Sequence, residues 1–200
     1  MKTVELLAPS GNEEAFFAAI NNGADAVYLG LSSFNARIKA DNFNANNIRK
    51  ITHIAHLFGV KVYITVNTII KNNEVNEFLS MIDECVNAKV DAFIIQDYGV
   101  AYLLKNRYKD IVMHASTQLG IHNLAGALVA KKLGFKRIIL SRETSLEDIK
   151  NIKQNTDLEI EYFIQGALCV SFSGNCYMSS LISGLSGNVN NIAVKNMQQC

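Results

Sequence analysis

The sequence predicts an α/β fold, a TIM-barrel-like (β/α) repeat that forms an incomplete barrel of about seven parallel strands. Short apolar runs alternate with helical patterns, at strand-to-strand steps of roughly 20 to 35 residues, which is typical of a parallel sheet. The strand candidates are continuous apolar runs, so both faces of the sheet are expected to be covered. Polar residues follow nearly every strand candidate. A barrel brings all these strand ends to one rim, whereas an open doubly wound sheet gathers only those beside its switch point.

The first third of the chain has three strand candidates. The first is the apolar run 4–8, which stops at a Pro-Ser-Gly-Asn turn. Apolar residues at helical spacing then predict a helix over 13–22, with Gly23 at its end. The apolar runs 24–31 and 62–66 predict the next two strands, and a helix over 46–58 lies between them and ends at Gly59.

The rest of the chain repeats this alternation. Helices are predicted over 74–87, 99–106, 123–133 and 145–153, and strands over 92–95, 111–115, 137–140 and 158–164. Gly134 is expected to end the third of these helices. Ser145 is a candidate N-cap for the fourth, because Asp148 follows three residues later, close to a capping box.

The composition is that of an ordinary globular protein. The chain has 200 residues, of which 49% are hydrophobic and 18% charged, and its net charge is +1. This charge gives no sign of a strongly basic nucleic-acid surface, although it leaves room for a local patch. No apolar run approaches the roughly 18 residues of a membrane span, and the opening apolar stretch is too short for a signal peptide. Four cysteines without a secretion signal favour a reducing, cytoplasmic compartment.

Candidate site residues come from the polar strand ends. His114 is a candidate for acid/base chemistry or for binding a substrate carboxylate, and Arg37 and Arg142 are candidates for binding an anion. Further polar residues at the same rim, candidates for substrate binding, are Asn35, Asn67, Asp97, Gln118, Glu143 and Gln165. The alternative for His114 is a hydrogen-bonded structural role, and for each arginine it is a surface ion pair.

Two cysteines after the last strand candidate form the sharpest feature of the sequence. Cys169 and Cys176 lie seven positions apart in an uncharged stretch rich in small residues. Such a pair can ligate zinc or an iron–sulfur cluster, and two unconnected thiols are the alternative. Cys200 is either a third ligand or an isolated terminal thiol. Cys85, within the helix predicted over 74–87, is expected to pack in the core.

The residues around this cysteine pair resemble a known family signature. The pattern is Glu161-x-Phe163-x-x-Gly166-Ala167-Leu168-Cys169-x4-Gly174-x-Cys176-x-Met178-Ser179. It is similar to the signature of peptidase family U32, the collagenase-like proteases. Other stretches that resemble the family are 5–12, 23–30, 35–37, 96–100, 116–118 and 141–143. The resemblance covers about residues 4–188.

The resemblance implies a U32-type barrel domain over 1–180, followed by a polar tail over 181–200. Family members are similar to one another in oxygen-independent hydroxylation of pyrimidines in tRNA or rRNA, with prephenate as a hydroxyl source, or act in ubiquinone biosynthesis. Several carry a [4Fe–4S] cluster on four cysteines. By position, Cys169 and Cys176 match the first two ligands, and Cys200 is the candidate for a third. The family pattern continues beyond Cys200, so the resemblance implies an incomplete ligand set and a chain shortened at its C-terminal end.

Two departures from the family pattern bear on the site. Val189 and Asn190 stand where the family has Arg-Gly, and Ile192 stands near an expected cysteine. Gln165 replaces the usual histidine before the glycine of the signature. Three hypotheses follow from the sequence: an RNA hydroxylase, a peptidase (a hydrolase) as the family name says, or an inactive fragment or subunit that binds a partner of the same family.

Overall fold

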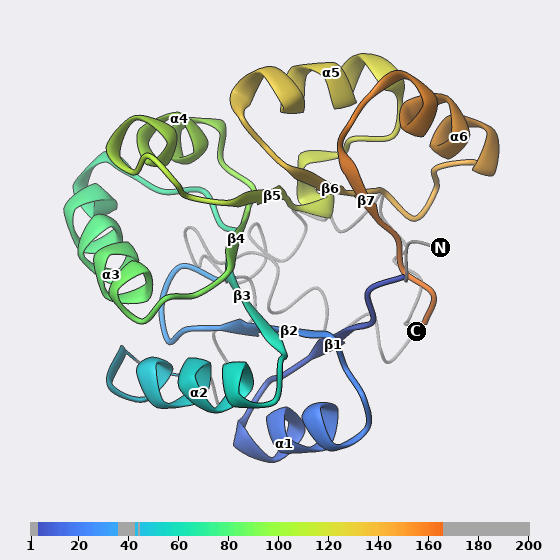
Figure 1. The fold of residues 1–200 in the computed structure, drawn as a ribbon. Coiled ribbons are helices and arrows are strands. Elements are labelled where there is room, and N and C mark those ends of the chain that lie inside the picture. The colour runs from blue at the N-terminus through green and yellow to red at the C-terminus, as the bar shows by residue number, and fades with distance from the viewer. Residues whose placement is uncertain (1–3, 36–42, 44, 166–200) are drawn as a thin grey trace, which may run out of the picture. The chain divides into compact units, whose positions relative to one another are not determined.

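The computed structural model describes residues 4–35, 43 and 45–165, in which strands and helices alternate along the chain (Figure 1). The strands are β1 (Leu7–Pro9), β2 (Ala26–Gly30), β3 (Lys61–Val66), β4 (Ala92–Ile95), β5 (Met113–Ala115), β6 (Arg137–Ile139) and β7 (Glu159–Glu161). The α-helices are α1 (Glu13–Asn21), α2 (Ala45–Leu57), α3 (Val75–Asn87), α4 (Tyr98–Arg107), α5 (Leu124–Leu133) and α6 (Leu146–Asn155). Two short 3-10 helices are η1 (Asn72–Glu74) and η2 (Thr117–Leu119).

The strand order confirms the predicted fold class. Seven parallel strands join in one sheet in the order β1-β2-β3-β4-β5-β6-β7, which is also their order along the chain. A doubly wound sheet reverses its order at a switch point, and this one does not. The topology is therefore that of a TIM-barrel-like repeat, with one strand fewer in the described residues than the eight of a complete barrel.

The first and last strands are shorter than the sequence suggested. The predicted start of the first strand is wrong, because Val4 is 92% exposed and β1 begins only at Leu7. β1 includes Pro9, which lacks an N–H, and among the described strands it pairs only with β2. An edge position tolerates this missing donor. β7 ends at Glu161, so the described residues 162–165 lie beyond the strand, and the predicted end of this strand at residue 164 is wrong.

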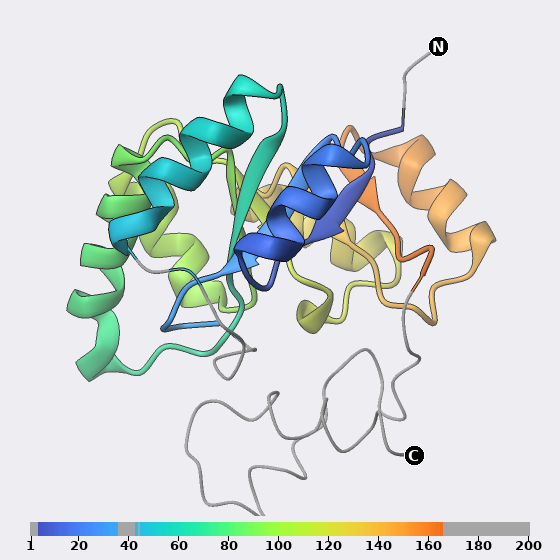
Figure 2. The ribbon, with the colours of Figure 1, turned by 90° about the horizontal axis from the view of Figure 1, so that it is seen from below.

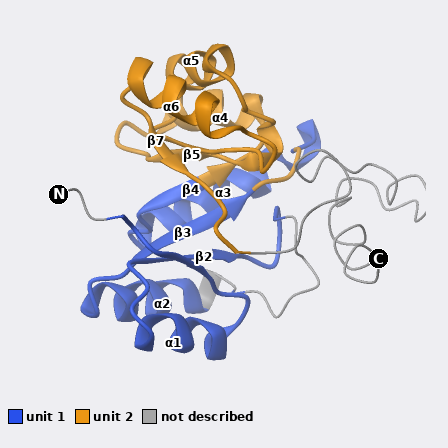
Figure 3. Ribbon diagram, turned by 90° about the vertical axis from the view of Figure 1, so that its right-hand side faces the viewer, with its two compact units in different colours: residues 1–66, 70–93 blue, residues 67–69, 94–200 orange. Residues whose placement is uncertain are grey.

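The chain divides into two compact units (Figure 3). Unit 1 comprises Met1–Val66 and Ile70–Phe93, and unit 2 comprises Asn67–Ile69 and Ile94–Cys200. No helix among the described residues is long and apolar enough to cross a membrane.

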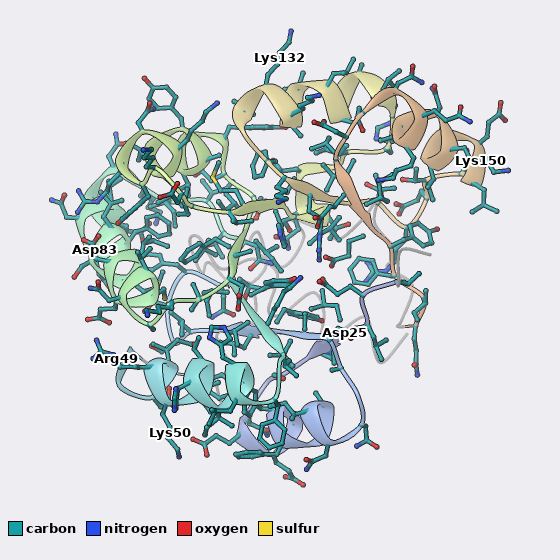
Figure 4. All side chains as sticks on the ribbon, viewed as in Figure 1. Asp25, Arg49, Lys50, Asp83, Lys132 and Lys150 are labelled. Atoms are coloured by element: carbon teal, nitrogen blue, oxygen red, sulfur yellow. The ribbon has the colours of Figure 1, made fainter. Side chains whose placement is uncertain are left out.

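In unit 1, helices α1 and α2 lie side by side against β1–β3 (Figures 1 and 2). The inward face of each helix carries apolar residues, such as the fully buried Phe16 of α1 and Ile51 of α2. On the outward face of α2, Arg49 and Lys50 extend away from the strands (Figure 4). Asp91, just before β4, accepts hydrogen bonds from His56 Nε2 at 2.8 Å and from Val62 N at 2.7 Å. Its carboxylate thus ties α2 to β3.

In unit 2, side-chain caps define where the helices begin. Ser145 Oγ accepts the Asp148 N–H at 3.1 Å, which confirms the predicted N-cap of α6. Asn123 caps α5 in the same way through the Gly126 N–H, at 2.9 Å. Gly134 ends α5 with φ at +94°, a left-handed conformation that glycine adopts without steric cost.

Cys85 packs in the core of unit 1, as predicted. It lies on α3 with Phe78 and Ile82, and all three residues are fully buried. Burial, and to a lesser extent the charge of Glu84, raises the pKa of the Cys85 thiol to about 12. Since the thiolate is the reactive form, this cysteine is chemically inert in the folded protein.

We therefore expect Cys85 to resist alkylation by iodoacetamide at any pH below about 9 while the chain is folded. Mass spectrometry of the peptide that contains Cys85 would measure the modification. A Ser80→Cys variant, at an exposed position of α3, is the matched control and should react readily. Equal rates at the two positions would contradict the buried assignment.

Candidate active site in unit 2

The carboxyl ends of β4 to β7 in unit 2 are joined by hydrogen bonds beyond the strands themselves. Ser116 N donates to Ile95 O at 2.8 Å, which ties the end of β5 to β4. Thr117 Oγ1 donates to Leu140 O at 3.2 Å, so η2 is held against the end of β6. Leu140 N donates to Glu161 O at 3.0 Å, which joins β6 to β7. The segments that follow these strands are therefore held close together.

The turn after β6 holds Arg142 against the segment that follows β7. The Arg142 guanidinium carbon lies over the Phe163 ring, 4.1 Å from its centroid. The hydroxyl of Tyr162 donates to the Arg142 carbonyl oxygen at 3.0 Å. A guanidinium over an aromatic ring gains cation–π attraction, and its planar fork suits carboxylates and phosphates. The anion-binding role predicted for Arg142 stays a prediction, and these contacts define where its guanidinium lies.

Three buried polar side chains lie on the segments after β5 and β6. The hydroxyls of Ser141 and Thr144 are 0% and 6% exposed by residue, and neither has a hydrogen-bond partner among the described residues. The Gln118 Oε1 atom is buried and also lacks a described partner. Buried polar groups are nearly always hydrogen-bonded, because leaving one unpaired costs about 1–3 kcal/mol. These atoms therefore mark a place suited to a polar ligand or to water.

A row of polar residues crosses the sheet at the beginning of β6. His114 of β5 is in register with Arg137, and Arg137 is in register with Glu159 of β7. Residues in register point to the same face of a sheet, so this row shares one face. Arg137 is only 8% exposed, and its guanidinium contacts Glu159 at 2.6 Å and Glu161 at 3.4 Å. His114 is 3% exposed and lies within the strand, deeper than a rim residue.

The remaining candidate residues are dispersed. Asp97 caps α4, since its Oδ1 atom accepts the N–H groups of Gly99 at 2.7 Å and Val100 at 3.2 Å. Asn67 follows β3 directly and is half-buried, whereas Glu143 and Gln165 are exposed. Asn35 belongs to unit 1, is 1% exposed and donates to the Leu31 carbonyl. Arg37, Cys169, Cys176 and Cys200 lie outside the described residues.

Sequence reasoning gave no role to Arg137, Glu159 or the aromatic pair Tyr162 and Phe163. The signal was present in the Glu-Ile-Glu sequence of β7. Glutamates two positions apart in a strand point to one face, which requires positive charge on a neighbouring strand if that face is covered. Arg137, the first residue of β6, supplies this positive charge.

The described part of the chain contains no group of three or more His, Cys, Asp or Glu side chains that could hold a metal ion. The predicted cysteine ligands lie beyond it. The structure does place the start of their motif, because Glu161 is its first residue and Arg137 contacts Glu161.

Comparison with known proteins identifies the family. The model of peptidase family U32 matches residues 11–193. The chain belongs to peptidase family U32. The U32 resemblance expected from the cysteine motif is confirmed over nearly the whole chain.

U32 relatives of this chain carry two kinds of name. It is 40% identical to the 23S rRNA 5-hydroxycytidine C2501 synthase of Escherichia coli, over 92% of this chain and 28% of that protein. It is 40% identical to the tRNA hydroxylation protein P of Helicobacter pylori, over 92% of this chain and 44% of that protein. It is 35% identical to a collagenase of Porphyromonas gingivalis, over 88% of this chain and 44% of that protein. The chain spans less than half the length of each of these relatives.

A solved U32 structure supports the fold. The U32 peptidase Mk0906 superposes with a TM-score of 0.68, covering 80% of this chain and 68% of that one, at 13% identity. A likeness at so low an identity shows the shared fold alone.

The Arg137 contacts lead to a prediction about stability. Replacing Arg137 with Met leaves the Glu159 and Glu161 carboxylates without their cation, and should lower the free energy of unfolding by about 3 kcal/mol. Removing one partner of a buried ion pair usually costs about 3–5 kcal/mol, and the lower value applies here because the Glu159 side chain is 45% exposed. Urea denaturation would measure the change. The exposed neighbour Lys136→Met is the control, expected within about 0.5 kcal/mol of the unchanged protein; equal effects of both substitutions would refute the role of the ion pairs.

Proposed function

We propose that this chain takes part in the oxygen-independent hydroxylation of a pyrimidine in tRNA or rRNA. The observation that carries the proposal is the 40% identity, over 92% of the chain, to a protein named as an rRNA 5-hydroxycytidine synthase. Relatives named as tRNA hydroxylation proteins match over a similar span. An RNA substrate and thiolate ligands both fit a reducing compartment, so we assign the activity to the cytoplasm.

The site after β5 and β6 suits a small polar acid as co-substrate. Replacing a ring hydrogen by a hydroxyl group removes two electrons from the pyrimidine. Without oxygen, the reaction balances if the hydroxyl donor gives up its hydroxyl group and takes the ring hydrogen (RH + R′OH → ROH + R′H), because the donor is then itself reduced by two electrons. A prephenate-like acid is our candidate donor, because Arg142 can bind a carboxylate bidentately. The hydroxyls of Ser141 and Thr144 can then donate to its carboxylate oxygens, and Gln118 Oε1 can accept from its hydroxyl group. His114 and Arg37 are proposed to complete the catalytic set.

We propose that a [4Fe–4S] cluster is held by Cys169, Cys176 and Cys200. A fourth ligand would come from another segment or from a partner subunit of the same family. When bound, such a cluster supplies one-electron transfer. The role of Arg137 in this proposal is positional: through Glu161 it anchors the β7 end from which the motif departs.

A peptidase is the second candidate, and the specific observation for it is the similarity to the Porphyromonas gingivalis collagenase. Gelatin cleavage that survives both Cys169→Ala and removal of iron would favour this activity over the hydroxylase. The two readings therefore differ in whether the cysteines are needed.

The proposed function can be tested in a strain that lacks the gene. Mass spectrometry of nucleosides from its tRNA and rRNA should show the loss of one hydroxylated pyrimidine, which the intact gene restores. Arg142→Gln should lower that modification at least about tenfold, the loss expected for one charge-assisted hydrogen bond. Lys150→Gln is the matched control, because Lys150 extends from α6 away from the sheet (Figure 4) and its loss should change nothing. If deletion leaves every hydroxylated pyrimidine of both tRNA and rRNA in place, the proposal is refuted.

The cluster has its own test. Protein purified without oxygen should contain iron and sulfide, with a broad visible absorbance that Cys169→Ala abolishes. Cys85→Ala is the matched control, since the buried Cys85 is not a proposed ligand, and it should keep the absorbance. An iron-free, colourless protein would overturn the cluster assignment.

A further inference from the structure

Unit 2 has a cavity away from the candidate active site, and none of the Arg142, Ser141, Thr144 and Gln118 side chains lines it. Its volume is about 320 Å³, and it lies between α4 and α5 beside the end of η2. Apolar walls come from residues such as Ile121, Val129 and Phe135, and Tyr98 and His122 add two flat rings. The volume falls in the range of small-ligand pockets.

Packing alone does not account for this open space. Gly126 lines the cavity, and a Cβ atom added there would meet Ile121 Cγ2 at 3.5 Å, an ordinary van der Waals distance. The backbone could therefore carry a larger side chain that fills part of the cavity. The cavity stays open because the sequence places small residues, Gly120, Gly126 and Ala130, along it.

The two rings lie beside the cavity in different settings. Tyr98 is the first residue of α4, directly after the Asp97 cap, and is 53% exposed. The His122 ring is held by a contact of 2.7 Å between its Nδ1 atom and the Gly120 carbonyl oxygen. Aromatic and histidine rings beside an apolar cavity are the groups on which proteins stack unpaired RNA bases.

The segment that carries the cavity is rich in positive charge, which is complementary to RNA. Residues 98–136 contain six basic side chains, all exposed, and a single acidic one. The basic residues are Lys105, Arg107, Lys109, Lys131, Lys132 and Lys136, of which Lys131 pairs with Asp157, outside this segment, at 2.7 Å. By contrast, the described part of unit 1 has five basic and nine acidic residues. Positive charge is therefore concentrated on this one part of the chain, although the whole chain is nearly neutral.

Helix dipoles explain only part of this charge. Lysines in the last turn of a helix are stabilised by its negative end, and Lys105 of α4 also donates to the Lys132 carbonyl oxygen in the last turn of α5, at 3.1 Å. Lys109 and Lys136 lie outside the helices, and no dipole accounts for the near absence of acidic residues. Lys132 extends from α5 away from the sheet, where it can meet a phosphate (Figure 4).

We propose that this cavity binds an unpaired nucleobase of the RNA substrate, one that flanks the modified pyrimidine, while the lysines at the ends of α4 and α5 contact RNA phosphates. The inference rests on the proposed function, because it takes the substrate to be RNA. Tyr98 and Lys105 are seven residues apart on one helix, so the base site and the phosphate site lie roughly 10 Å apart. That distance lies within the span of a few nucleotides.

Fluorescence polarisation with the full chain and a fluorescein-labelled single-stranded RNA of about 12 nucleotides tests the proposal. Tyr98→Ala should weaken binding by about 5- to 100-fold, the effect of one lost stacked base. Val129→Trp, which fills the cavity, should weaken it similarly. The controls are Tyr102→Ala and Leu128→Trp, which change exposed residues on the same helices that do not line the cavity, and both should bind as the unchanged chain does.

A second readout separates stacking from loss of structure. The readout uses a set of RNAs, each with one abasic nucleotide at a different position. One of them should bind the unchanged chain as weakly as the intact RNA binds Tyr98→Ala. The same abasic RNA should bind Tyr98→Ala no more weakly than the intact RNA does. Binding of Tyr98→Ala and Val129→Trp at control levels would overturn the proposal. So would equal competition by polyglutamate, which would indicate an acidic protein partner. Failure of the proposed function is seen separately, as RNA whose pyrimidine hydroxylation does not depend on the gene.

Discussion

The arrangement of unit 2 depends on one buried cation, the Arg137 guanidinium at the start of β6. Burying a charge is costly unless it is paired, and Arg137 is paired with both Glu159 and Glu161. Because side chains alternate along a strand, a shift of β7 by one residue would turn both carboxylates to the opposite face. The ion pairs therefore fix the register of β7 against β6, which apolar packing alone would specify less strongly.

That register determines where the polar groups of the site lie. With β7 in place, Glu161 O accepts the Leu140 N–H, and the chain beyond β7 brings Tyr162 and Phe163 to the turn that carries Arg142. The same turn contains the buried hydroxyls of Ser141 and Thr144. Unpaired buried hydroxyls reduce stability, and such a cost is typical of places where a ligand is bound. The ion pairs of Arg137 thus lie within the strands, and the unsatisfied hydroxyls lie on the turn that follows β6.

The sequence predicted the alternation of strands and helices because local signals mark most boundaries. Ser145 with Asp148, and the glycines at 59 and 134, act within one turn of the chain, so they are visible without tertiary structure. Predictions failed or fell short where distant residues decide. Val4 is apolar but 92% exposed, so the first strand begins later than its apolar run. The contacts of Arg137 join residues more than 20 positions apart, which no local pattern reveals.

The short helix η2 contributes residues to both candidate sites of unit 2, the site around Arg142 and the cavity between α4 and α5. Gln118 faces one way, with its Oε1 atom buried and unsatisfied, and the next residue, Leu119, lines the cavity between α4 and α5. η2 is itself held at its beginning, by the Ser116 cap and by the hydrogen bond of Thr117 to Leu140. Because η2 is only three residues long, a ligand that shifts it on one side also shifts the surface that it presents on the other. A base bound against Leu119 would therefore hold η2, and with it Gln118, in one position beside the acid bound to Arg142. Binding of RNA and binding of the small acid would then favour each other.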